Sequence, residues 1–242
     1  MKVPEPTLDS AGGTPGRAAA RRPGRPSGGV GGAEQRARLI DAALALFARQ
    51  GILDTSLAAI AREAGVTPAM VHYYFKTRDQ LIDVLIDERF VPLREALGDI
   101  FAEHPDDPVT ALTALAQRFV ALGQRNPWFP PLWVRDVISE GGVLRQRMLE
   151  RVGREHQEKA HTAIARWQRE GRLNAALEPS LLFQSLMGLT LLPLATSQMW
   201  RGDARQPHVG VEAIARHAVA LITEGVGPGP IDARADTGTD TD

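Results

Sequence analysis

The sequence predicts an all-α fold, and three observations support this. From residue 34 to residue 224 the large apolar side chains recur every three or four residues, which is the period of an amphipathic helix. The same region has no convincing run of strand length in which apolar and polar residues alternate. Hydrophobic residues make up 43% of the 242 residues and charged residues 24%, so a sizeable core is possible. We expect a small N-terminal and a larger C-terminal helical domain.

Both ends of the chain are expected to be disordered. Residues 1–33 consist mostly of Gly, Pro, Ala and Arg, and residues 225–242 are first rich in Gly and Pro and then acidic, so neither segment can form a core. The first segment is basic, and Arg22 and Arg25 stand beside prolines in an extended stretch. It lacks the apolar run of a secretory signal, so we expect a cytoplasmic protein.

A small domain of three helices is expected over residues 34–80. Ser56 can cap the second helix through its hydroxyl. Thr67 followed by Pro68 supplies an N-cap hydroxyl and a preset first helical φ for the third. The three helices are expected at residues 34–50, 57–64 and 68 to about 75.

A long apolar-periodic stretch from residue 79 to residue 101 connects the two domains. Pro92 lies inside it and has no N–H to donate to the carbonyl group four residues earlier. We therefore expect a kink near Glu88.

The second domain is expected to cover residues 81–224. Pro127, Pro130 and Pro131 interrupt the helical pattern and predict an irregular connection that holds several large aromatic side chains. Residues 181–200 carry no charge and are about as long as a membrane-spanning helix, but Pro193 and several polar side chains favour a soluble helix, so no membrane partner is expected. The helices are expected at residues 109–124, 143–170, 180–200 and 209–224.

Residues 55–75 have the form of a helix-turn-helix, in which the second helix enters the major groove of DNA. Val71 and Phe75 lie four residues apart and are expected to face inward. The opposite face then carries small side chains that allow close approach to bases and hydrogen-bond donors for phosphates, although the aromatic residues could instead cover the helix junction. The exposed residues are expected to include Pro68, Ala69, His72 and Tyr73.

Residues 65–81 read Gly-Val-Thr-Pro-Ala-Met-Val-His-Tyr-Tyr-Phe-Lys-Thr-Arg-Asp-Gln-Leu and closely resemble the DNA-binding signature of the TetR family of transcriptional regulators. The resemblance covers roughly residues 35–82, and beyond them only the architecture is similar. It implies that the N-terminal domain reads DNA, that the C-terminal domain binds a small molecule, and that the last two helices form a homodimer. By this resemblance the base-reading positions are Thr67, Pro68, Ala69, Met70 and His72, and the phosphate-holding positions are Tyr73, Tyr74, Lys76 and Arg78.

The sequence departs from the family pattern at two positions of the second helix. Ala58 stands where many members have a polar residue that can reach DNA, and Ala59 stands where an acidic residue often completes a capping box with Ser56. Arg22 and Arg25 could replace a missing contact by lying in an A·T-rich minor groove. A solvated tail explains these arginines about equally well.

A ligand site is expected in the second domain, where large apolar and aromatic side chains are typical of small-molecule pockets. The effector would then be apolar or amphipathic. Each of these side chains is also an ordinary core residue, and only the aromatic concentration around Trp128 favours a pocket. Polar residues that could orient a ligand are His104, Arg135, Asp136, His156 and Gln184. The candidate lining residues are Phe101, Phe119, Trp128, Phe129, Trp133, Met148, Trp167, Phe183 and Met187.

The implied function is that of a repressor, a homodimer that binds a palindromic operator in double-stranded DNA and is released by its effector. No enzyme activity, metal or cofactor is expected. The chain has no cysteine, and His156 and His161 are five residues apart, which places them roughly 140° apart around a helix. A helical ligand-binding or scaffolding protein with a vestigial helix-turn-helix remains the alternative, since Ala58 offers DNA no polar group.

Overall fold

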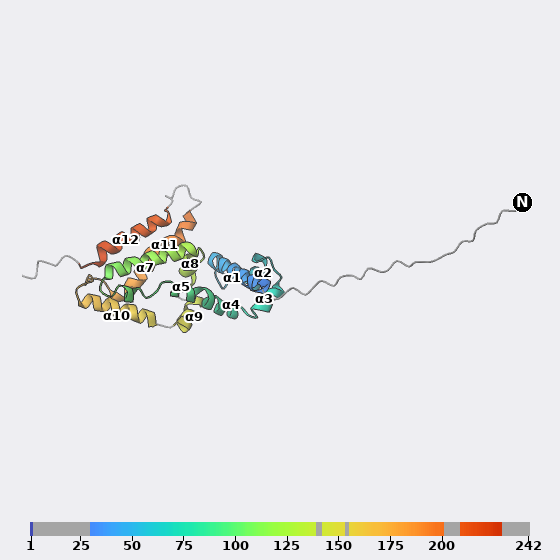
Figure 1. Ribbon diagram of the computed structural model, residues 1–242, viewed down its shortest axis with the longest axis horizontal. Helices are drawn as coiled ribbons and strands as arrows, with labels where there is room; N and C mark the ends of the chain where they lie inside the picture. Colours follow the sequence, from blue (N-terminus) through green and yellow to red (C-terminus); the bar gives the residue numbers. More distant parts are fainter. Residues whose placement is uncertain (2–29, 139–141, 153–154, 201–208, 229–242) are drawn as a thin grey trace, which may run out of the picture.

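The computed structural model describes Met1 and residues 30–138, 142–152, 155–200 and 209–228, and every regular element in this part of the chain is a helix (Figure 1). The all-α prediction is confirmed. Arg22 and Arg25 lie outside the described residues. The elements are α1 (Val30–Gln50), α2 (Leu57–Glu63), α3 (Pro68–Tyr74), α4 (Arg78–Leu85), η1 (Ile86–Phe90), α5 (Val91–Glu95), α6 (Ile100–Glu103), α7 (Pro108–Arg125), α8 (Phe129–Leu132), η2 (Trp133–Val137), α9 (Val143–Val152), α10 (Glu155–Arg169), α11 (Pro179–Trp200) and α12 (Val211–Val226).

Helices α1, α2 and α3 lie together at one end of the molecule, where α1 also contacts α4 and α8 (Figure 1). Helix α1 starts at Val30, four residues earlier than expected, and its apolar face, which includes Leu39, Ala43 and Phe47, is buried. Ser56 caps α2 as predicted, because its Oγ accepts a hydrogen bond of 3.1 Å from the Ala59 N–H. The predicted side-chain cap at Thr67 is wrong. Thr67 has the extended backbone of an N-cap residue, but its side chain makes no capping hydrogen bond and is exposed.

Helix α4 follows α3 after a short turn and begins at a double cap. The Thr77 Oγ1 accepts a hydrogen bond of 3.2 Å from the Gln80 N–H, and the Gln80 Oε1 accepts one of 3.1 Å from the Lys76 N–H. This pattern of threonine and glutamine three residues apart resembles a capping box. It fixes the direction in which the chain leaves α3.

The arm formed by α4, η1 and α5 joins the two domains (Figure 1). The distortion expected near Glu88 is a π-helical turn, η1, in which the Val91 N–H bonds to the Ile86 carbonyl group just before Pro92. The expected stretch to residue 101 is not one helix, because it ends near Gly98, which has a φ of +67°. The short α6 starts after this turn.

Helices α7, α11 and α12 pack against one another and form the core of the second domain, with α8 beside α11 (Figure 1). The inner face of α7 is buried and includes Leu112 and Phe119, which are each 1% exposed. Over Pro179–Ser197 helix α11 is long and apolar enough to cross a membrane, but by length and composition alone. A buried core helix of a soluble protein passes the same test. Helix α11 packs against α7 and α12, and 33% of this stretch is buried.

One prediction about this domain is wrong. The connection after Pro127 is helical, because Pro130 and Pro131 lie in the first turn of α8, where a proline removes no needed N–H. The helix expected over residues 143–170 corresponds to α9 and α10, and residues 153–154 between them lie outside the described part.

Candidate nucleic-acid interface

Helix α3 presents one face to solvent and one to the core of the N-terminal domain. Val71 and Phe75 are 0% and 1% exposed, as predicted, and hold the helix in place. The outward face consists of small and polar side chains, which suits close approach to another surface. Its exposed residues are Thr67, Pro68, Ala69, His72 and Tyr73, while Met70 is half-buried.

The two tyrosines at the end of α3 have different surroundings. Tyr73 is 77% exposed, whereas Tyr74 is half-buried, with the two rings 5.1 Å apart, edge to face. The Tyr74 hydroxyl donates a hydrogen bond of 3.0 Å to the Gly32 carbonyl group at the start of α1. Tyr73 is therefore available to a partner, while the one donor of Tyr74 already connects α3 to α1.

The two cations that follow α3 also differ. Lys76 is exposed. Arg78 is half-buried, and its Nη1 donates hydrogen bonds of 3.3 Å and 3.1 Å to the carbonyl groups of Ile52 and Leu53. Arg78 thus supports the loop between α1 and α2, a role that the sequence analysis missed, although the rest of its guanidinium group can still face an anion.

The loop between α1 and α2 is stabilised by a hydrogen bond within the loop and by a contact from the second domain. Gly51 has a φ of +90°, and the buried Thr55 Oγ1 donates a hydrogen bond of 2.6 Å to its carbonyl group. Asp136 of η2 is 6% exposed and hydrogen-bonds to the backbone of Ile52, while its Oδ2 has no hydrogen-bond partner. Burial raises the pKa of the Asp136 carboxyl group, against the opposite effect of Arg135. The second domain therefore contacts the N-terminal domain at the loop that leads into the helix-turn-helix.

Helix α1 is tied to the arm by a bidentate ion pair. The Arg36 Nη1 and Nη2 lie 2.7 Å and 2.6 Å from the Glu88 carboxylate oxygens, and these hydrogen bonds lower the pKa of Glu88. The Arg36 guanidinium group also lies 5.5 Å from the centre of the Phe75 ring, at the end of α3. One side chain thus connects the recognition helix, α1 and η1.

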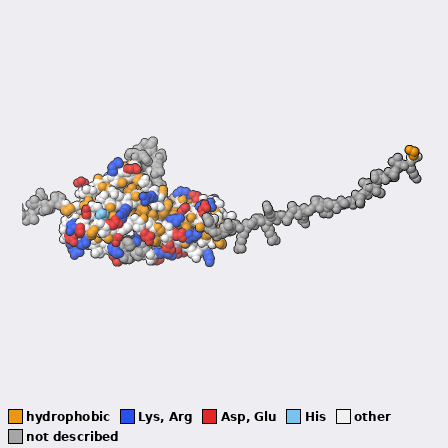
Figure 2. Space-filling view, in the orientation of Figure 1, with side chains coloured by type: hydrophobic (Ala, Val, Ile, Leu, Met, Phe, Trp, Pro, Cys, Tyr) orange, Lys and Arg blue, Asp and Glu red, His pale blue; other side chains and the backbone are white. Residues whose placement is uncertain are grey.

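Basic and acidic side chains are intermixed on the face seen in Figure 2. This agrees with the net charge of −1. Near α3, the exposed Lys76, His72 and Tyr73 are available to a polyanion.

The candidate ligand-binding residues lie in separate groups of packed aromatic rings. Phe101 and Trp167 are 5.8 Å apart between ring centres, Phe119 and Phe183 are 5.7 Å apart, and Trp128 contacts both Phe129 and Phe90 of η1. Trp133, Met148 and Met187 lie in or against the same core, so the ligand role of all these residues stays a prediction.

Two open hollows are present on the second domain. One of about 490 Å³ lies between α6 and α10 and includes Phe101, and one of about 800 Å³ lies between α4 and α9. Of the polar candidates, Asp136 is buried, Gln184 and Arg135 are exposed, His104 is half-buried, and the His156 side chain lies outside the described part. In the part of the chain that the structure describes, no group of three His, Asp or Glu side chains could hold a metal ion.

Comparison with known proteins finds matches to both domains. Residues 39–85 match the family described as "Bacterial regulatory proteins, tetR family". The HTH-type transcriptional regulator SrpR of Pseudomonas putida is 29% identical over 118 residues, which are 48% of this chain and 54% of SrpR. TtgW, another HTH-type transcriptional regulator of Pseudomonas putida, is 29% identical over 118 residues, 48% of this chain and 85% of TtgW. The match thus spans about half the length of SrpR.

The likeness to solved structures extends over most of the chain. The ketosteroid transcriptional regulator KstR2 of Mycobacterium tuberculosis superposes with a TM-score of 0.64 and 16% identity, over 81% of this chain and 96% of KstR2. At this identity the likeness shows the fold alone.

Proposed function

We propose that this member of the TetR family of DNA-binding transcriptional regulators is a cytoplasmic repressor and not an enzyme. It binds a palindromic operator as a homodimer and is released by a small-molecule effector. The observation that carries this proposal is the exposed face of α3. Small side chains at Pro68 and Ala69 stand between hydrogen-bonding side chains, on a helix fixed from below by Val71 and Phe75. Such a face can enter the major groove without first rearranging.

The contacts to DNA divide into two kinds. We assign base reading to the exposed Thr67, Pro68, Ala69 and His72, with the half-buried Met70 at the edge of the face. Thr67 has its hydroxyl free for this role, since it does not cap α3.

Phosphate contacts are assigned to the exposed Tyr73 and Lys76. Tyr74 and Arg78 stay proposed DNA-binding residues, but their hydrogen bonds to Gly32 and to the loop after α1 favour a supporting role. Arg22 and Arg25 are proposed to lie in the minor groove. Unchanged affinity and salt dependence after removal of residues 1–29 would argue against that contact.

The proposed dimer interface is formed by α11 and α12. Leu181, Leu192 and Leu221 are 53%, 44% and 47% exposed, although each belongs to a helix whose other face is buried. Two copies of these helices could bury the exposed leucines in a symmetric four-helix interface. A dimer would also supply the two recognition helices that a palindromic operator requires.

The proposed effector is apolar or amphipathic and acts through the aromatic side chains of the second domain. Trp128 and Phe129 lie 5.2 Å and 6.2 Å, between ring centres, from Phe90 of the arm. A ligand that displaced either ring would therefore move η1, which leads to the DNA-binding helices. Candidate compounds would be tested by their ability to release the protein from DNA.

The proposal is tested with DNA that the chain itself selects. The full-length protein would be incubated with a pool of random double-stranded DNA, and the enriched sequence, the selected duplex, would be compared with a shuffled duplex of the same composition by fluorescence anisotropy. We expect the selected duplex to bind about 1000-fold more tightly, as specific DNA-binding proteins do.

The Tyr73→Ala variant tests the proposed phosphate contact. This side chain is exposed, so its loss should leave the fold intact. We expect it to weaken binding of both duplexes about tenfold, since it removes a phosphate contact. If the folded wild-type protein enriches no sequence, the repressor proposal is wrong and the ligand-binding or scaffolding alternative takes its place.

A further inference from the structure

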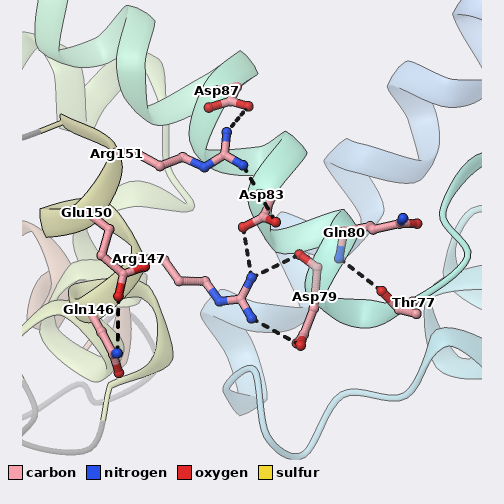
Figure 3. Close-up of polar contacts among 9 residues, drawn as sticks. All are labelled: Thr77, Asp79, Gln80, Asp83, Asp87, Gln146, Arg147, Glu150 and Arg151. Carbon is pink, nitrogen blue, oxygen red and sulfur yellow. Dashed lines mark hydrogen bonds and ion pairs between the residues drawn. The ribbon is translucent and has the colours of Figure 1, made fainter.

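Three carboxylates lie one helical turn apart along one face of the arm. They belong to Asp79 and Asp83 of α4 and Asp87 of η1. Facing them are two guanidinium groups of α9, Arg147 and Arg151, which are also one turn apart (Figure 3). We call these five residues the ionic ladder.

Each arginine bridges two neighbouring carboxylates. Arg147 lies 3.1 Å from the Asp79 Oδ2 and 2.8 Å from the Asp83 Oδ1, and it also donates a hydrogen bond of 3.3 Å to the Asp79 carbonyl group. Arg151 lies 3.6 Å from the Asp83 Oδ2 and also pairs with Asp87. Asp83 is shared, so the pairs form one connected network (Figure 3).

The ladder selects one register of α4 against α9. A shift of one turn, about 5.4 Å, toward Val91 would leave Arg151 with one carboxylate, that of Asp87, and would leave Asp79 without an arginine. A shift in the other direction would move Arg147 to the start of α4, where Asp79 is the one carboxylate of the ladder within its reach. Only the observed register gives both arginines two carboxylates each, and any other register would leave charges unpaired.

Helix α9 is in turn anchored in the second domain. Leu144 is 1% exposed and belongs to the core, and α9 packs against η2, which contains the predicted ligand residue Trp133. On the other side, the Thr77 and Gln80 cap connects α4 to the end of α3. The ladder therefore lies between the second domain, which holds α9, and the recognition helix α3, which is connected to α4.

We propose that Arg147 and Arg151 are positioning residues for DNA recognition, which hold the arm, and with it α3, in the register that reads the operator. The inference rests on the proposed function. Single surface ion pairs contribute little, but a network that shares Asp83 and exists in one register can distinguish two arrangements of the domains. The ladder would then favour specific reading over mere attraction to phosphates.

The first test compares Arg147→Glu with Arg145→Glu. Both variants make the same change of charge on α9, but Arg145 is exposed and has no place in the ladder. The measured quantity is the ratio of affinities for the selected and shuffled duplexes. We expect Arg147→Glu to lower this ratio about tenfold, within the usual range of coupling between sites, and Arg145→Glu to leave it unchanged. Equal ratios in the two variants would overturn the proposal.

The second test exchanges one pair of charges. Arg151→Asp and Asp87→Arg should each lower the ratio, and the double variant should have a higher ratio than either single variant, because the pair with position 87 is formed again with its charges reversed. The recovery should be partial, since the introduced carboxylate also faces Asp83. Failure of the double variant to recover would also overturn the proposal. If the wild-type protein does not distinguish the two duplexes, the proposed repressor function is wrong. If the wild-type protein distinguishes them and the ladder variants behave like Arg145→Glu, only the proposed role of the ladder is wrong.

Discussion

The two domains differ in how their functional residues relate to their cores. In the N-terminal domain the proposed reading residues lie on the outside of α3, and Val71 and Phe75 hold the helix from the inside. In the second domain the proposed ligand residues lie in the core or pack against it, and Trp167 and Phe119 are 0% and 1% exposed. A surface function can thus be changed without loss of stability, whereas a ligand site built into a core cannot.

The largest expected effect is on stability and concerns Trp167. Trp167→Ala should lower the free energy of unfolding by about 3–5 kcal/mol, because it removes a large buried side chain. It also removes the hydrogen bond of 2.6 Å from the indole Nε1 to the Pro105 carbonyl group. Denaturant unfolding would measure the change. Trp167→Phe should lose much less, and a fully stable alanine variant would mean that Trp167 is not part of the core.

The next effect is on DNA binding alone and concerns Ala69. Ala69→Glu places a carboxylate on the exposed face of α3, where it would be repelled by the phosphates, so affinity for the selected duplex should fall about 100-fold. The melting temperature should stay within a few degrees of the wild type, because the position is exposed. A variant that bound as tightly as the wild type would show that α3 does not enter the groove.

Asp136 lies between the two regions and predicts a pH dependence. Its pKa is raised by burial, so the folded chain binds this proton more tightly than the unfolded chain does. Ionisation of the buried Asp136 carboxyl group therefore destabilises the folded chain. This destabilisation is absent below the pKa of the unfolded chain and grows as the pH rises through the pKa of the folded chain. Asp136→Asn should therefore increase the free energy of unfolding by about 1 kcal/mol at neutral pH, and the gain should vanish in acid. A constant difference from neutral pH to about pH 4 would contradict this account.

The smallest effect concerns Tyr74, whose hydroxyl bonds to the Gly32 carbonyl group. Tyr74→Phe should lower the free energy of unfolding by about 0.5–1.5 kcal/mol and weaken DNA binding only a few-fold. Thermal unfolding and anisotropy would measure the two changes. A loss of DNA affinity as large as that of Ala69→Glu, with stability unchanged, would instead make Tyr74 a direct DNA contact.

The sequence predicted the N-terminal domain well because its signals are local. Ser56, Gly65 and Pro68 mark helix ends by their own chemistry, and the inward facing of Val71 and Phe75 follows from helical spacing alone. The cap at Thr77 and Gln80 was missed, although its spacing of three residues could have revealed it.

The second domain was predicted less well because its features depend on tertiary contacts. The prolines at 130 and 131 can break a helix or begin one, and only the packing of α8 decides between the two. The roles of Arg78, Asp136 and Arg147 depend on partners that are 25 or more residues away, so no local pattern identifies them.

The measurement that tests the central claim most directly is the affinity of the full-length protein for the selected duplex with both half-sites intact and with one half-site scrambled. A homodimer that reads a palindrome through two copies of α3 predicts a loss of about 100-fold or more on scrambling, because half of the base contacts disappear. Equal affinity for the two duplexes would contradict the account, since it would mean that a single helix-turn-helix, or the phosphates alone, supply the binding.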